Sequence, residues 1–106
     1  MEEKLMEAIS AGSILVITYK NTQRMIEPHT LGINRNGSVQ LCAWQLTEKE
    51  PEDECFPETV EKGSDGWRLF TVDKIGDPML TNGEFEGTRD GYNPNDSRFP
   101  TILATR

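Results

Sequence analysis

Residues 24–45, RMIEPHTLGINRNGSVQLCAWQ, decide the fold together with residues 67–75, WRLFTVDKI. In the first segment, Asn36-Gly37 supplies the positive φ angles that a tight hairpin turn needs. The residues on either side of this turn, 24–33 and 38–46, are predicted to form two strands. Pro28 cannot donate a hydrogen bond to a sheet, so we expect an edge, a bulge or a bend there. The two segments predict a β-hairpin and a partner strand, and their Arg and His side chains indicate a pocket for an anionic group.

The rest of the chain supplies a helix and further short strands. Residues 2–11 place Leu5, Ala8 and Ile9 on one helical face, and Gly12 is a good terminator. Residues 13–20 are rich in β-branched residues and apolar on both faces, so we expect a strand that is covered on both sides. Further strands are predicted over 38–46 and 67–72, near 78–81 and at 101–104, with a tight or 3₁₀ turn at 73–76.

These elements predict a mainly β fold: a small five-stranded antiparallel Sm-like or SH3-like barrel with an N-terminal helix. A chain of 106 residues is expected to form a single domain. We expect barrel strands within 13–47 and 67–81, a long acidic loop over 48–66 and an extended tail over 82–106. The tail should dock on the barrel, because exposing its apolar side chains would be costly. These are Phe99, Ile102 and Leu103.

Most of the negative charge is concentrated in the predicted loop. The chain has a net charge of −7, and residues 48–66 carry −6 of it. Segments 13–47 and 67–76 together carry +3. An acidic chain normally argues against nucleic acid as a partner, but this distribution weakens that argument. The loop lacks the regular alternation of an EF-hand, so we interpret it as solvated linker rather than a calcium site.

Other function classes have little support. No apolar run is long enough to span a bilayer and no signal peptide follows Met1, so a cytoplasmic protein without membrane contact is expected. Cys42 and Cys55 are interpreted as free thiols, and a single histidine argues against a zinc site. We find no catalytic triad, phosphate-binding loop or cofactor motif. We therefore expect no catalytic residues, no metal and no cofactor, and do not expect an enzyme.

The order of motifs resembles the WYL domain, an Sm-like ligand-sensing barrel of bacterial transcriptional regulators. The run RLFTVDKI at 68–75 is the more specific part of the resemblance, which covers roughly residues 5–86. The naming Trp-Tyr-Leu triplet falls on Val39-Gln40-Leu41, of which only Leu41 is kept. The family usually follows a helix-turn-helix DNA reader, for which this chain has no room. The matching residues are Ile9, Tyr19, Arg24, Pro28, Leu31, Gly37, Leu41, Ala43, Arg68, Phe70, Asp73, Lys74, Ile75 and Phe85.

Five residues are candidates for ligand contact. Arg24 and Arg68 come first, because guanidinium groups suit phosphate and carboxylate. Lys74 would add charge, and Tyr19 and His29 would support the site. Four of them have a structural alternative: Arg24 pairs with Glu27 or Asp73, Arg68 faces solvent, Tyr19 fills the core, and His29 is a hydrogen-bonded sheet residue. The sequence leaves these alternatives open.

Two functions follow from different classes. In the first, the chain is a standalone WYL-like regulatory module that binds an anionic ligand, a nucleotide or a short nucleic acid, in a basic pocket. In the second, it is a protein-interaction or self-assembling module, since small barrels expose strand edges that pair with a protein partner or another copy.

Overall fold

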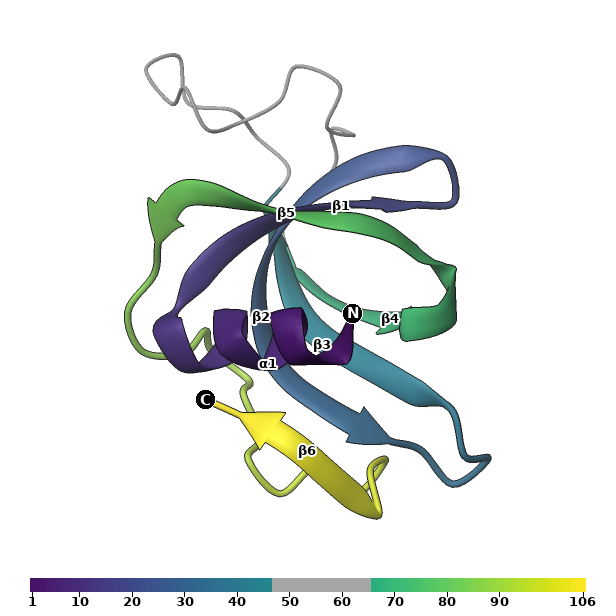
Figure 1. Ribbon diagram of the computed structural model, residues 1–106. Coiled ribbons are helices and arrows are strands. Elements are labelled where there is room, and N and C mark those ends of the chain that lie inside the picture. Colours follow the sequence, from purple (N-terminus) through teal and green to yellow (C-terminus); the bar gives the residue numbers. More distant parts are fainter. Residues whose placement is uncertain (47–65) are drawn as a thin grey trace.

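The computed structural model of the chain describes residues 1–46 and 66–106 (Figure 1). One helix and six strands carry the fold. The predictions for the acidic loop lie outside the described residues, except that Gly66 belongs to a strand and not to the loop. In chain order the elements are α1 (Glu2–Ala11), β1 (Ser13–Tyr19), β2 (Thr22–Ile33), β3 (Val39–Leu46), β4 (Gly66–Thr71), the 3₁₀ turn η1 (Val72–Lys74), β5 (Ile75–Glu84) and β6 (Thr101–Thr105).

The strands form one curved antiparallel sheet in the order β4-β3-β2-β1-β5, with β6 added beside β2. The mainly β antiparallel fold with an N-terminal helix is therefore confirmed. The two ends of the sheet, β4 and β5, are joined by η1. Across this seam the Thr71 N–H donates to the Tyr19 hydroxyl at 3.1 Å, which links β4 to β1. Because these strands are not neighbours in the sheet, the bond ties the β4 end of the curved sheet to β1, which lies next to β5 at the other end.

Strand β2 is the centre of the sheet and has a bulge in its middle. Along one edge it pairs first with β1, through residues 22–26, and then with β6, through residues 30–33. On its other edge it pairs with β3, with a register shift between Pro28 and Thr30 that leaves His29 as the extra residue. The predicted irregularity at Pro28 is confirmed, and its cause is the missing N–H of proline.

The turns differ in detail from the predictions. The turn between β1 and β2 consists of Lys20 and Asn21, both at positive φ, so β1 ends one residue before the expected end at residue 20. In the turn after β2, only Gly37 has positive φ, and its N–H donates to the Asn34 carbonyl at 3.0 Å. The Asn34 side chain accepts the N–H groups of Asn36 and Ser38 at 3.0 and 2.9 Å. This is a three-residue hairpin loop with one αL glycine, and not the tighter turn that Asn-Gly suggested.

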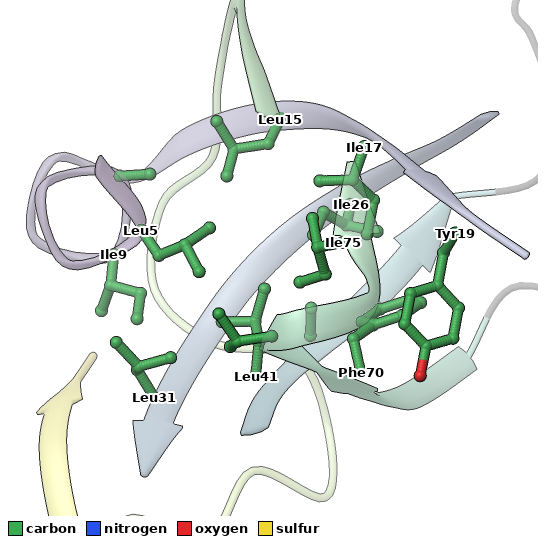
Figure 2. Packing of buried hydrophobic residues seen from close by; sticks show 13 residues of the cluster. Leu5, Ile9, Leu15, Ile17, Tyr19, Ile26, Leu31, Leu41, Phe70 and Ile75 are labelled. Atoms are coloured by element: carbon green, nitrogen blue, oxygen red, sulfur yellow. The ribbon is translucent and has the colours of Figure 1, made fainter. Parts of the chain in front are cut away.

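The main core lies inside the barrel and is closed on one side by α1. Figure 2 shows Leu5 and Ile9 of the helix facing strand residues such as Leu15, Leu31 and Leu41. Full burial of each such side chain contributes about 1.5–3 kcal/mol. On the other face of β1, Val16 forms a second, smaller cluster with Met25, its cross-strand partner in β2. The prediction that β1 is covered on both faces therefore holds at Val16, which is buried, and fails at Thr18, which is exposed.

The C-terminal segment is more structured than a simple extended tail. Strand β5 continues to Glu84, three residues beyond the expected end, and β6 pairs with β2. Phe99 is buried against Gly32, where a Cβ would lie only 2.7 Å from the Phe99 ring. Ile102 and Leu103 are each 37% exposed. Docking of the tail is thus confirmed for Phe99 and is incomplete for the other two residues.

Candidate functional site

Arg24 and Arg68 both lie on the inner face of the sheet. Arg24 of β2 is paired with Ile17 of β1, which belongs to the core. Arg68 of β4 lies two residues before the core residue Phe70 and is paired with Ala43. Because side chains alternate along a strand, both arginines share the face that carries the core. Both are partly buried. Charged side chains are rarely buried without a partner, so this placement sets the two arginines apart from surface residues.

Gln45 of β3 lies between the two arginines. It is 3% exposed and is paired with Ile26 of β2 on one side and with Gly66 of β4 on the other. The Arg24 Nη1 group donates to Gln45 Oε1 at 3.4 Å. The Arg68 Nη1 atom lies 3.0 Å from the position that a Cβ on Gly66 would take. Arg24 therefore contacts Gln45 directly, whereas Arg68 lies beside Gly66, the cross-strand partner of Gln45, and its Nη1 group donates to the Trp67 carbonyl at 3.0 Å. We call Arg24, Gln45 and Arg68 the basic cluster.

Tyr19 borders the basic cluster. The guanidinium carbon of Arg24 lies 5.5 Å from the centre of the Tyr19 ring and 5.9 Å from that of Phe70, which is cation–π geometry. The two rings meet edge to face at 4.9 Å, and the Tyr19 hydroxyl accepts the Thr71 N–H described above. Tyr19 thus fills the core, which was its structural alternative, and its ring also packs against the Arg24 guanidinium group. Figure 2 shows its ring beside Phe70 at the edge of the core.

The alternative in which Arg24 pairs with Glu27 is wrong, because Glu27 forms an ion pair with Arg89. Glu27 lies on the opposite face of β2, and its carboxylate accepts two hydrogen bonds from Arg89, at 2.6 and 3.0 Å. The side chain of Glu27 is 4% exposed, so Arg89 compensates a buried charge. Arg89 comes from the segment after β5, and its sequence position gave no indication of this role.

His29 lies on the outer side of the sheet, away from the basic cluster. It is fully buried, and its ring has contacts with the rings of Trp67, Phe85 and Tyr92, with centroids 4.8, 5.2 and 5.7 Å away. Its Nδ1 lies 2.8 Å from the Glu27 carbonyl oxygen, and its Nε2 accepts the Arg89 N–H at 3.2 Å. These partners require the neutral tautomer with the proton on Nδ1. The structure therefore places His29 in a structural role.

Burial sets the protonation of His29. Desolvation lowers the pKa of the ring below its ordinary value, which outweighs the opposing effects of the Glu27 backbone and carboxylate. The guanidinium groups of Arg106 and Arg89 lower the pKa further. The imidazole is thus held neutral near pH 7, in agreement with its two hydrogen bonds.

Lys74 is peripheral. It is exposed at the end of η1, one residue before Ile75, which pairs with Tyr19. The structure thus places Tyr19, Arg24 and Arg68 on the inner face of the sheet. It leaves Lys74 exposed at the surface and places His29 on the opposite face. It adds Gln45, which is not among the five candidates from the sequence.

Within residues 1–46 and 66–106, no group of three or more His, Cys, Asp or Glu residues is arranged to hold a metal ion. In the same ranges, the only α-helix, α1, is too short to cross a membrane. Comparisons of the chain with protein-family models, with curated proteins and with solved structures found no match. The resemblance to the WYL domain therefore stays a prediction from the sequence.

Proposed function

We propose that the chain is a WYL-like regulatory module that binds an anionic ligand, a nucleotide or a short nucleic acid, at the basic cluster. The observation that supports this most is that two arginines on the inner face of the sheet flank β3 at Gln45: Arg24 of β2 donates to its amide oxygen, and Arg68 of β4 lies beside Gly66, its cross-strand partner. Arginine presents several N–H donors in a plane and retains its charge at all physiological pH values. Two such groups, from the strands on either side of β3, suit the oxygens of one phosphate or carboxylate.

The contacts that hold Arg24 in place favour ligand binding over catalysis. Arg24 is held by Gln45 and by the Tyr19 and Phe70 rings, so its position is set before a ligand arrives. Such preorganisation reduces the cost of ordering side chains on binding. The proposed outcome is regulation or sequestration of the ligand, without a chemical step.

A thermal-shift experiment tests this function. Nucleotides and short oligonucleotides are added to the full chain, and the unfolding midpoint is measured. A ligand at one hundred times its Kd stabilises the folded state by about 2.7 kcal/mol, so a true ligand raises the midpoint. Arg24→Gln and Arg68→Gln should each reduce that shift. The matched control is Arg35→Gln, which removes the same charge from the exposed loop after β2.

Two results would contradict the proposal. Either no member of the panel raises the midpoint of the wild-type chain, or the two cluster variants and the Arg35→Gln control are shifted equally. Circular dichroism of each variant before the titration shows that the fold is intact.

One observation favours the alternative of a protein-interaction or self-assembling module. Strand β5 is at one end of the sheet and pairs only with β1 among the described strands. It exposes two large apolar side chains, Met79 at 50% and Leu80 at 61%. An edge strand of this kind can add a strand from another chain. Light scattering of the wild type and of Met79→Lys distinguishes the alternatives, since only a β5-mediated assembly would dissociate in the variant.

A further inference from the structure

A cavity of about 440 Å³ lies on the outer face of the sheet, remote from the inward-facing basic cluster. Its floor is formed by side chains of β2, β3 and β4, and its roof by the segment that leads to β6. Thr30 and Cys42 of the floor are cross-strand partners and are both buried. The principal lining residues are Thr30, Cys42, Trp67, Tyr92, Asp96 and Arg98.

The charges in this cavity compensate each other. Arg98 donates from Nη2 to Asp96 Oδ2 at 2.6 Å and from Nε to Oδ1 at 3.0 Å. The hydrogen bonds from Arg98 lower the pKa of the Asp96 carboxyl, so the pair stays ionised at neutral pH. The same Nη2 group lies 3.7 Å from the Cys42 sulfur. Burial raises the pKa of that thiol against the opposing effect of Arg98, so the thiol is neutral. The site as a whole carries no net charge.

Arg98 nevertheless retains donors for a ligand. Its hydrogen bonds to Asp96 and Cys42 use Nε and Nη2. Among the residues that the structure describes, none accepts a hydrogen bond from Arg98 Nη1. Asp96 thus fixes the direction of the guanidinium group over the cavity and leaves one end of it available.

The aromatic walls offer apolar ring surface. The Trp67 indole N–H donates to the Asp90 carbonyl at 2.8 Å, and the Tyr92 hydroxyl donates to the Arg106 carbonyl at 2.6 Å. Because the polar ends of both side chains are occupied, what they present to the cavity is mainly ring carbon. Flat rings pack well against such surfaces. The volume is near the lower end of known ligand pockets, which fits a molecule of one or two rings.

We propose that this cavity binds a small planar aromatic compound that carries one hydrogen-bond acceptor, a carbonyl or carboxylate, directed at Arg98. The ring lies against Trp67 and Tyr92, and the acceptor meets the Nη1 group of the guanidinium. The compensated charge of the site disfavours a polyphosphate, which separates this ligand class from the one proposed for the basic cluster. The two sites lie on opposite faces of the sheet, so their tests are independent.

Protection of the Cys42 thiol tests the proposal with indole-3-carboxylate as the probe. In a full-length Cys55→Ser background Cys42 is the only thiol, and its modification by methyl methanethiosulfonate is followed by mass spectrometry. We expect saturating probe to slow the reaction about tenfold and to shift the Trp67 indole N–H signal in an NMR spectrum. Indole, which has the ring without the acceptor, should bind about tenfold more weakly, as expected for the loss of one charge-assisted hydrogen bond.

Two variants complete the experiment. Arg98→Gln should weaken indole-3-carboxylate about tenfold, and Asp96→Asn should weaken it less, because the guanidinium remains but is no longer oriented. Lys74→Gln, an exposed residue that does not line the cavity, is the matched charge control and should leave the affinity unchanged. The proposal is overturned if millimolar probe leaves the Cys42 rate unchanged, or if Arg98→Gln and Lys74→Gln bind the probe equally well.

Discussion

At the scale of single residues, His29 links protonation to folding. Its Nε2 accepts a backbone N–H from Arg89, and protonation would replace that acceptor with a donor. The group has a lowered pKa in the folded state and an ordinary value near 6.5 when unfolded. Between these two values the unfolded chain binds more protons than the folded chain. The stabilisation is therefore complete above pH 6.5 and is lost as the pH falls below it.

We predict that the free energy of unfolding decreases below pH 6.5 with a slope of at most about 1.4 kcal/mol per pH unit from this residue. Urea denaturation from pH 7.5 to pH 5 measures it. His29→Gln keeps a donor and an acceptor but cannot be protonated, so its free energy of unfolding should depend less on pH. Because it loses the ring contacts, it should also be less stable at pH 7.5 by roughly 2 kcal/mol. An unchanged slope in the variant would show that other groups are responsible.

The residue scale also explains which parts of the site the sequence could predict. Arg24, Arg68 and Tyr19 were recognised from their positions in strands and from the WYL resemblance. His29 was only a supporting candidate, and its neighbours along the chain do not show that the backbone N–H of Arg89, 60 residues away in sequence, donates to its ring. The Glu27–Arg89 ion pair and the contact of the Asp96–Arg98 pair with Cys42 likewise join the segment after β5 to the sheet. Contacts of this kind depend on how the segment after β5 folds back over the sheet, and that segment has no periodic pattern to read.

At the scale of elements, Gly32 and Phe99 fix the path of the segment before β6. A Cβ on Gly32 would lie 2.7 and 2.8 Å from the Cγ and Cβ atoms of Phe99. We predict that Gly32→Ala displaces the Phe99 ring and destabilises the protein by about 1–3 kcal/mol, the usual cost of overpacking. Phe99→Ala should cost roughly 3 kcal/mol through the cavity that it leaves.

A double-mutant cycle checks this contact by chemical denaturation. If the steric conflict is the cause, Gly32→Ala should cost much less in the Phe99→Ala background than in the wild type. Additive effects would mean that Gly32 is needed for a reason other than the Phe99 ring.

The elements themselves were largely predictable, because they depend on local pattern. The helix at 2–11, the β-branched run of β1 and the irregularity at Pro28 follow from residue properties that act over a few positions. The errors were in turns and in the C-terminal segment. Asn36-Gly37 is compatible with more than one hairpin loop, and the loop that forms uses the Asn34 side chain as an additional acceptor. The extension of β5 to Glu84 depends on its pairing with Ser13 of β1, a contact between distant parts of the chain.

At the scale of the whole molecule, the curved sheet separates two chemical environments. The inner face carries the apolar core and, beyond it, the basic cluster. The outer face carries the ring contacts of His29 and the cavity next to Cys42. Because β2 and β3 contribute residues to both faces, a ligand on one face contacts strands that also support the other. We do not need a conformational change to account for either site, since each is present in the folded chain.

The central claim is that Arg24 and Arg68 act together on one anionic group, and isothermal titration calorimetry of the best nucleotide or oligonucleotide from the thermal panel tests it most directly. We predict that Arg24→Gln and Arg68→Gln each weaken binding at least about tenfold, that the double variant loses less or more than the sum of the two free-energy changes, and that Arg35→Gln binds as the wild type does. Losses that are strictly additive would contradict the account. So would losses no larger than that of the Arg35→Gln control.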